Sequence, residues 1–221
     1  MYTHKFSRNA FSSKQQKKVR AATFAIIGLG GTGGFMLENL LRMGAEHFIV
    51  FDYDRFELTN FNRQMLATSR SLDEPKTKMA LERAMEINAG VRMELGGAFG
   101  SRSSLAGASI LLDGSDSAAT KLLASQLARK SRIPYVFCAA SGTRGIVSVF
   151  RGYDFRKAFQ LSRGTGARSC QEILCPAAAL AGTLAASAAV NCLIGKPFAR
   201  APDAVFFDTF SEKLFWRAGL G

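Results

Sequence analysis

The sequence predicts an α/β protein with a Rossmann-like, doubly wound and mostly parallel sheet, and with an extension at the C-terminal edge. Short apolar runs alternate with helical patterns along most of the 221 residues, which is typical of this fold class. A glycine-rich segment, GLGGTGG (28–34), stands between the first apolar run and the first helical pattern. With 48% hydrophobic and 21% charged residues, the composition is that of a globular chain that can bury a sizeable core.

Each element in the first half has its own pattern. The run TFAII is short, apolar and partly β-branched, as in a central parallel strand. The segment FMLENLLRMG has apolar residues at helical spacing and ends in a glycine. The elements expected here are an N-terminal arm or short helix (1–20), a strand (23–27), a helix (35–44), a second strand (47–52) and an amphipathic helix (76–88).

The second half continues the alternation and then changes character. We expect a strand running into a Gly-Ser turn (108–116), a helix (117–130), strands (133–140 and 145–150), a crossing loop (151–175), a long helix (173–194) and edge strands (198–216). The crossing loop is rich in Arg, Gly and Ser and has little periodicity. No linker indicates a second domain, so we expect residues 21–221 to form one domain behind the arm.

The long predicted helix is apolar enough to be compared with a membrane-spanning helix. Residues 173–194 carry no charge over 22 positions, which is long enough to span a bilayer. They are mostly Ala, Gly, Ser and Thr, however, and small side chains suit close helix packing inside a protein. We therefore expect a buried or subunit-interface helix and no membrane association. Because no secretory signal is visible, we expect a cytoplasmic protein with reduced thiols.

The chain is strongly basic. Its formal net charge is +12, from 29 Lys and Arg against 17 Asp and Glu. This balance favours anionic partners such as nucleotides, an acidic protein or nucleic acid, although a solvated basic face would look the same.

The glycine-rich loop predicts nucleotide binding. Gly28, Gly30 and Gly33 match the pattern GxGxxG, in which the glycines permit a tight turn, close approach of a phosphate and helix–strand packing. Asp52 follows 19 residues after Gly33, at the end of the next strand, where a carboxylate can bind ribose hydroxyl groups. NAD and FAD are the usual ligands of this pattern. A dehydrogenase needs little from the loop after its second strand, yet here that loop is densely polar.

Five motifs together indicate a family. In order and spacing, GLGGTGG, FDYD, TNFNRQ, EPKTKMALERAMEINAG and LLDGSDS resemble the adenylation domain of the ThiF, MoeB and HesA proteins, which also occurs in ubiquitin-activating enzymes. The resemblance covers about residues 4–150 and is weaker beyond. It implies an ATP-dependent adenylyltransferase, a homodimer that uses Mg²⁺ and activates the C-terminal glycine of a ubiquitin-like sulfur carrier ending in Gly-Gly.

The resemblance also implies site residues. It assigns the nucleotide loop to Gly28, Gly30, Gly31 and Gly33 and the ribose-binding acid to Asp52. The phosphate ligands are Asn60, Arg63 and Lys76. Asp116 is the acid that supports Mg²⁺, and Arg8 is the arginine that reaches the ATP of the partner subunit. Arg8 stands in FSRN, where the family has Tyr-x-Arg-Gln, so Asn9 departs from the pattern.

The chemistry of the residues agrees with these roles. A carboxylate that attacks the α-phosphorus approaches a triphosphate that is already anionic, so cations that neutralise and position the phosphates are needed. Structural alternatives remain. Lys76 is a first-turn residue at a helix end that disfavours cations, Asp116 suits a helix N-cap, and Asp54 suits either a structural role or the ribose side.

The cysteines depart from the family. Many members bind a structural zinc through two C-x-x-C pairs, whereas Cys170 and Cys175 are separated by four residues and have no second pair, so we expect no zinc. Some relatives use a cysteine in this region to accept the acyl group or sulfur. Cys170 has a basic setting that lowers a thiol pKa, and Cys175 is the competitor, but an unreactive thiol is the simpler interpretation.

Other functions stay open. A relative of the tRNA threonylcarbamoyladenosine dehydratases would use the same ATP site on a carboxylate carried by tRNA, and the basic charge suits RNA. An enzyme that activates a small carboxylate in cofactor synthesis, a nucleotide-dependent scaffold and an NAD enzyme are the remaining classes.

Overall fold

The computed structural model describes residues 2–160 and 172–220. Its strands form one sheet in the order β3-β2-β1-β4-β5-β6-β7-β8. The strands are β1 (Thr23–Ile27), β2 (His47–Phe51), β3 (Arg92–Gly96), β4 (Ile110–Asp113), β5 (Tyr135–Ser141), β6 (Arg144–Phe150), β7 (Asp203–Asp208) and β8 (Phe215–Gly219). The pairings from β3 to β5 are parallel, and those from β5 to β8 are antiparallel. The predicted fold class is therefore confirmed.

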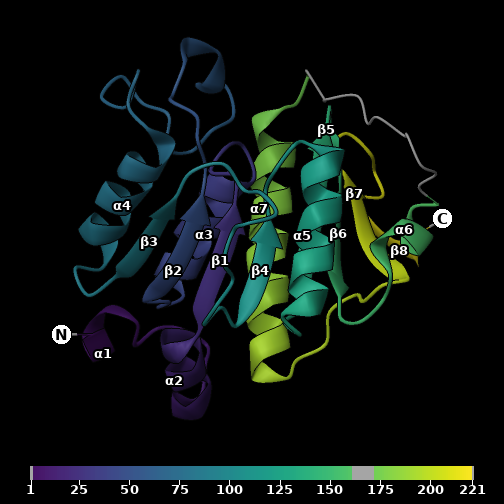
Figure 1. Ribbon diagram of the computed structural model, residues 1–221, viewed down its shortest axis with the longest axis horizontal. Coiled ribbons are helices and arrows are strands. Elements are labelled where there is room, and N and C mark those ends of the chain that lie inside the picture. The colour runs from purple at the N-terminus through teal and green to yellow at the C-terminus, as the bar shows by residue number, and fades with distance from the viewer. Residues whose placement is uncertain (1, 161–171, 221) are drawn as a thin grey trace.

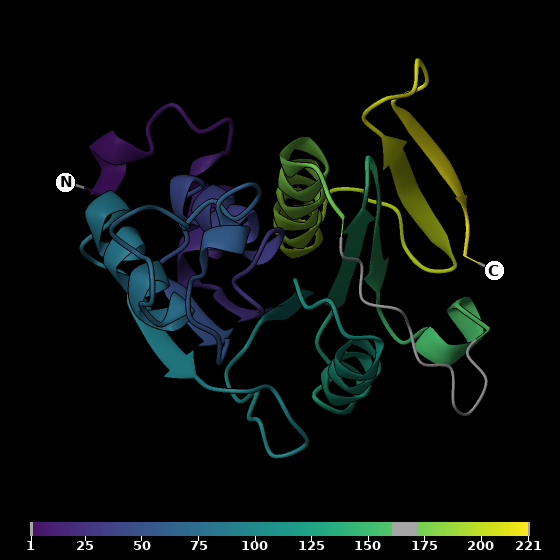
Figure 2. The same cartoon turned by 90° about the horizontal axis from the view of Figure 1, so that it is seen from above.

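Helices cover both faces of the sheet (Figures 1 and 2). On one face lie α3 (Gly33–Arg42), α4 (Lys76–Ile87) and α7 (Cys175–Ile194), whose apolar residues form one core cluster. On the other face lie α5 (Ala118–Lys130) and the short α6 (Phe155–Ala158), which contribute to a second cluster. The remaining helices are α1 (Tyr2–Lys5), α2 (Ser13–Ala21) and the 3₁₀ turn η1 (Leu58–Asn60).

One strand was not expected from the sequence, and the N-terminal segment adopts one of its two expected forms. Strand β3 is not predicted, because it is a short edge strand of mostly exposed residues that lacks an apolar pattern. The expected N-terminal arm contains a capped helix, α2. Ser12 accepts a hydrogen bond from the backbone N–H of Gln15, whose side chain caps in return, and Val19 is fully buried. Burial of Val19 attaches the arm to the core.

Helix α7 is the segment that is long and apolar enough to cross a membrane, by length and composition, within the described residues. In this structure it packs against β5, β6 and α3, and its Ala-rich face is buried. A Cβ on Gly182 would lie 2.3 Å from the Thr32 carbonyl oxygen and 2.8 Å from the Phe35 Cβ. Small residues therefore let α7 approach the start of α3 closely.

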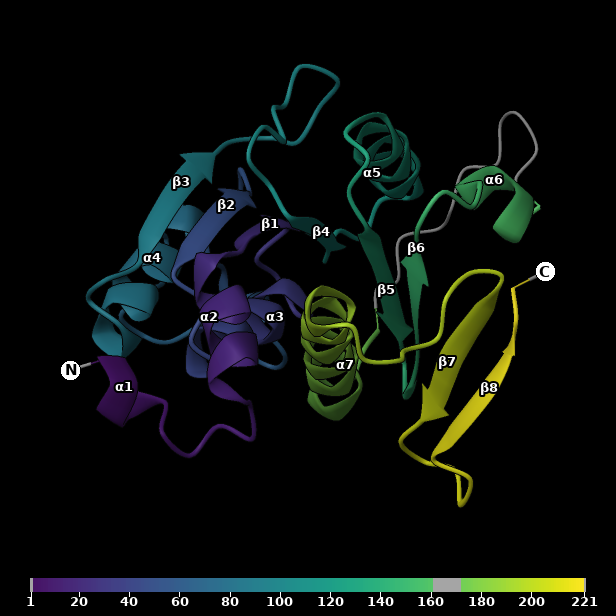
Figure 3. The same cartoon turned by 90° about the horizontal axis from the view of Figure 1, so that it is seen from below.

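The C-terminal strands form the predicted edge extension. The hairpin of β7 and β8 continues the sheet beyond β6 and projects past the helical layers (Figure 3). The rings of Phe206 and Trp216 stack across this hairpin at 5.8 Å between centroids.

Candidate functional site

The candidate site lies where the sheet order reverses between β1 and β4. In open α/β sheets this switch point leaves a crevice at the carboxyl ends of the strands, because the chain leaves the two strands toward opposite faces. The loops after β1, β2 and β4 lie at that end, which is the upper end in Figure 1. These loops contain most of the predicted site residues.

The glycine loop has the geometry that its sequence predicts. Gly28 has a φ of +76°, and a Cβ on it would meet the Gly114 carbonyl oxygen at 3.0 Å. A Cβ on Gly33 would lie 1.8 Å from the Gly28 carbonyl oxygen, so no other residue fits there. Within the described residues, no acceptor is found for the backbone N–H groups of Gly30 and Gly31. These donors at the start of α3 form a cradle suited to a phosphate.

Asp52 ties the end of β2 to this loop. Its Oδ2 accepts a hydrogen bond of 2.6 Å from the backbone N–H of Leu29, and its Oδ1 accepts one of 2.8 Å from the N–H of Asp54. The carboxylate is thereby fixed beside the glycine loop, at the position from which it can bind a ribose.

Asp54 and Lys76 form an ion pair beside Asp52. Lys76 Nζ lies 3.0 Å from Asp54 Oδ2, and the lysine side chain is only 7% exposed while that of Asp54 is 48% exposed. The carboxylate supplies the anion that a cation in the first turn of a helix requires. The pair gives Asp54 a structural role and leaves any additional contact of either side chain with a phosphate as a prediction.

The polar loop after β2 folds over the glycine loop. Asn60 ends η1 and is buried, and its Oδ1 accepts a hydrogen bond from the N–H of Glu57. Arg63 Nη1 donates to the Thr59 carbonyl oxygen and to Asn62 Oδ1, both at 2.9 Å. The Cγ of Arg63 lies 3.6 Å from the position of a Cβ on Gly31. The structure thus brings Arg63 to the phosphate cradle.

Gln64 is a site residue that we did not single out from the sequence. It is buried, and its Nε2 lies 3.7 Å from the position of a Cβ on Gly30. Its Oε1 has no hydrogen-bond partner among the residues that the structure describes. A buried polar atom without a partner is rare, and the amide that carries it lies beside the glycine loop. Its place directly after Arg63 in TNFNRQ was the available signal.

The turn after β4 carries two acids with different surroundings. Asp113 is fully buried and accepts hydrogen bonds of 2.6 Å from both Tyr135 Oη and Ser115 Oγ. Burial, together with the neighbouring Asp113 carboxylate, raises the pKa of Tyr135 well above its usual value, so the phenol remains a donor. Asp116 is exposed, and its carboxylate has no partner among the described residues.

Asp116 is not the helix N-cap that was its structural alternative. Ser117 caps α5 instead, because its side chain accepts from the backbone N–H of Thr120. Gly114 packs against Gly33, with 3.0 Å between a Cβ built on Gly114 and the Gly33 Cα, which places this turn beside the phosphate cradle.

Arg8 is not brought to the site within its own chain. The neighbouring Asn9 donates from Nδ2 to the Met43 carbonyl oxygen, at the C-terminal end of α3. The glycine loop is at the other end of this 10-residue helix, and such a helix is about 15 Å long. Arg8 is therefore next to a residue bound at the end of α3 that is distant from the glycine loop.

The thiols differ in accessibility. Cys175 begins α7 and is exposed. Cys138 is buried, and burial raises its pKa to about 11, so it is a poor nucleophile. The other predicted candidate, Cys170, lies outside the described residues, as does much of the predicted crossing loop.

The residues present fit ATP and Mg²⁺. The glycine cradle, with its backbone N–H donors, suits an anion, and Asp52 suits a ribose. Among the described residues, no group of three or more His, Cys, Asp or Glu forms a metal cluster. Magnesium bound to a nucleotide needs only one or two carboxylates, because phosphates and waters complete its octahedron, and Asp116 fits that role.

Comparison with known proteins identifies the family. The model of the ThiF family matches residues 2–218. The chain belongs to the ThiF family. This ThiF-family chain is 31% identical over 204 residues to the sulfur carrier protein adenylyltransferase of Thermus thermophilus. The alignment covers 83% of this chain and 74% of that protein.

Two further similarities are shorter or more distant. The tRNA threonylcarbamoyladenosine dehydratase of Bacillus subtilis is 34% identical over 87 residues, which are 38% of this chain and 34% of that protein. The match thus spans about a third of that relative's length. The solved structure of PaaA superposes with a TM-score of 0.78 at 16% identity, covering 93% of this chain and 66% of that chain, which confirms the ThiF-type fold.

Proposed function

We propose that this ThiF-family chain is an ATP-dependent adenylyltransferase that activates a carboxylate. The observation that carries the proposal is the cradle made by the N–H groups of Gly30 and Gly31, with Arg63 passing over it and Asp52 fixed at its side. This arrangement suits a nucleotide whose triphosphate lies on the start of α3. The relative from Thermus thermophilus, similar over most of both chains, is an adenylyltransferase.

The reaction follows from this geometry. A carboxylate oxygen attacks the α-phosphorus, the bond from that phosphorus to the bridging oxygen breaks, and pyrophosphate leaves with the bond electrons. The product is an acyl-adenylate. Arg63 and Lys76 offset the charge of the phosphates, the cradle positions them, and Asp52 orients the ribose. Mg²⁺ at Asp116 would supply further charge neutralisation.

We propose the C-terminal glycine of a ubiquitin-like sulfur carrier as the carboxylate. The similarity to an enzyme named for a sulfur carrier protein supports this substrate. The exposed Cys175, at the start of α7, and Cys170 are then candidate acceptors of the activated group. We further propose a homodimer, because Arg8 lies at the far end of α3 from its own nucleotide loop.

Exchange of labelled pyrophosphate into ATP tests the activity. With Mg²⁺ and a carrier ending in Gly-Gly, we expect exchange that depends on the carrier and is lost in Arg63→Ala, Lys76→Ala and Asp116→Ala. A carrier truncated by its last glycine is the matched control and should give no exchange. Wild-type exchange in all three variants would mean that the site is misplaced.

A second candidate substrate is a carboxylate carried on tRNA. The similarity to a tRNA threonylcarbamoyladenosine dehydratase and the net charge of +12 support it. The same exchange assay with threonylcarbamoyladenosine-containing tRNA in place of the carrier distinguishes the two. Formation of a cyclised nucleoside, detected by mass spectrometry, would select the tRNA substrate.

A further inference from the structure

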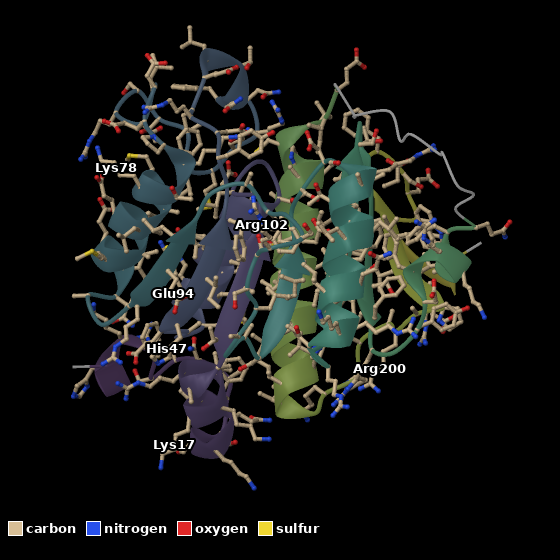
Figure 4. The ribbon with its side chains drawn as sticks, viewed as in Figure 1. Lys17, His47, Lys78, Glu94, Arg102 and Arg200 are labelled. Atoms are coloured by element: carbon tan, nitrogen blue, oxygen red, sulfur yellow. The ribbon has the colours of Figure 1, made fainter. Side chains whose placement is uncertain are left out.

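A pocket lies at the amino ends of β2 and β3, opposite the carboxyl ends of the strands where the nucleotide site lies. It has a volume of about 560 Å³ and is lined by Lys17, Arg20, Glu46, His47, Gly90 and Arg92. Lys17 and Arg20 come from α2, His47 begins β2 and Arg92 begins β3. Because β2 and β3 are parallel, both contribute their amino ends, whereas the nucleotide loops follow the carboxyl ends. Lys17 and His47 lie at the lower part of Figure 4.

The cationic side chains that line the pocket outnumber its carboxylates. Glu46 is its one carboxylate, and Glu46 Oε2 lies 2.7 Å from Arg20 Nε. Within the described part of the chain, no carboxylate lies within ion-pair distance of the side chains of Lys17 and Arg92. His47 adds a ring N–H donor. Two uncompensated positive charges that converge on one pocket favour an anion.

The basic character extends along the same edge. Helix α5 ends directly before β5, and the segment after α7 leads into β7, so both bring basic residues to the amino ends of the strands. These exposed residues include Lys130, Arg132, Lys196 and Arg200, and none forms an ion pair with another described residue. Arg200 lies at the same lower end as Lys17 in Figure 4, across the width of the molecule. A line of positive charge therefore runs from the pocket along the edge.

Helix ends explain only part of this charge. Cations near the C-terminus of a helix are stabilised by its dipole, which accounts for residues such as Lys130 and Lys196. Lys17 lies in the middle of α2 and Arg92 begins a strand, so neither gains from a helix end. A helix dipole therefore does not explain the charges of these two residues.

We propose that this amino edge is an RNA-binding surface, with the pocket of Lys17 and Arg92 holding a backbone phosphate. RNA fits because its phosphates are spaced along a chain that can follow the basic line, whereas a small anion would use the pocket alone. A carrier protein fits less well. Its C-terminal tail must reach the opposite ends of the strands, about 17 Å away for five residues at 3.3 Å each.

Fluorescence anisotropy tests the surface with the full chain and a labelled, unmodified tRNA transcript. We expect wild-type affinity to fall linearly with the logarithm of the salt concentration. Lys17→Gln and Arg92→Gln should each weaken binding and lower the slope of this dependence by about 1. Arg102→Gln removes the same charge from the exposed loop between β3 and β4, away from this edge in Figure 4, and should bind like wild type.

Three results would overturn the proposal. The first is absence of RNA binding by the wild type at low salt. The second is an equal loss in Arg102→Gln and in the two pocket variants, which would indicate net charge alone. The third is displacement of the RNA by polyglutamate at equal charge concentration, which would indicate an acidic protein partner. Unchanged thermal unfolding of each variant establishes that it is folded, and the assay contains no ATP, so its outcome is separate from that of the proposed adenylation.

Discussion

Lys76 Nζ and Asp54 Oδ2 lie 3.0 Å apart and join the start of α4 to the segment after β2. The lysine is almost fully buried, and this carboxylate is its counterion. Lys78, in the first turn of α4, lies 2.9 Å from Glu74, which stands just before the helix, and their side chains are 51% and 36% exposed. The two pairs therefore differ mainly in the burial of the lysine, which is 7% exposed in Lys76 and 51% exposed in Lys78.

Asp54→Ala should destabilise the fold by about 1–2 kcal/mol, between the values for exposed and fully buried pairs, because it leaves Lys76 without its counterion. Glu74→Ala should change the free energy of unfolding by less than about 0.5 kcal/mol. Urea unfolding at neutral pH measures both. Equal effects in the two variants would contradict the difference that burial predicts.

Alanine substitutions at two glycines of the loop should affect folding and nucleotide binding differently. A Cβ on Gly31 would make ordinary contacts, at 3.5 Å from Ala178 Cβ, so Gly31→Ala should fold normally but weaken ATP binding by narrowing the cradle. Gly33→Ala should not fold, because its Cβ would overlap the Gly28 carbonyl oxygen. Gly97→Ala, where a Cβ meets nothing within 4 Å, is the control. Calorimetric titration with ATP measures the binding, and wild-type affinity in Gly31→Ala would argue against this cradle.

The thiols should react in a fixed order. Cys175 is exposed, whereas the pKa of Cys138 is raised by burial to about 11. At pH 8, a maleimide should label Cys175 within minutes and Cys138 only after unfolding, since the thiolate is the reactive form. A Cys170→Ser background simplifies the mass spectra. Labelling of native Cys138 at the rate of Cys175 would refute the assignment.

Stability at acid pH should depend on Glu38. Burial raises its pKa, but hydrogen bonds from Arg83 and Arg42 outweigh burial, so the pKa is lowered from 4.5. Stability from such a depressed carboxyl pKa is fully present above the unfolded-state value and is lost as the pH falls through the folded-state value.

Glu38→Gln should therefore cost about 2 kcal/mol at pH 7 and flatten the decline in stability below about pH 4.5. Glu86→Gln, which removes the exposed partner of Arg83, should leave that decline in place. Urea unfolding between pH 3 and 7 checks both variants. If the stability of Glu38→Gln falls at acid pH as much as that of the wild type, the loss of stability is due to other carboxyl groups.

Mixing inactive variants tests the proposed dimer. Arg8→Ala and Asp116→Ala should each lack carboxylate-dependent exchange. If Arg8 acts on the partner subunit, mixed dimers contain one intact site and should recover up to about a quarter of the wild-type activity, since random mixing gives half heterodimers with one site each. Mixing each variant with itself is the control. Absence of recovery in dimers confirmed to have exchanged subunits would contradict a shared site.

The apolar patterns of the sequence predict most of the fold. Most residues of β1, β2, β4 and β5 are buried, so these runs are mostly apolar, and that is visible without a structure. The exposed edge strand β3 lacks such a constraint and was not predicted. Likewise, α2 is joined to the folded unit by the burial of Val19 and by contacts such as Arg20 with Glu46, which its polar sequence does not reveal.

The family motifs name most of the candidate site, because the glycine loop and its acid have fixed spacing along the chain. The pairing of Asp54 with Lys76 joins residues 22 positions apart, and the orphaned Oε1 of Gln64 is a property of packing. Such contacts exist only once the loops after β1, β2 and β4 meet.

The sequence alone determined the strand and helix alternation, the nucleotide loop and the family, because local periodicity and short motifs carry that information. Tertiary structure alone decided which acid after β4 is buried, that Arg8 lies away from its own nucleotide loop, and that Lys17 and Arg92 share a pocket. Those relationships depend on which strand ends become neighbours, and strand order is set by packing of the whole sheet rather than by any one segment.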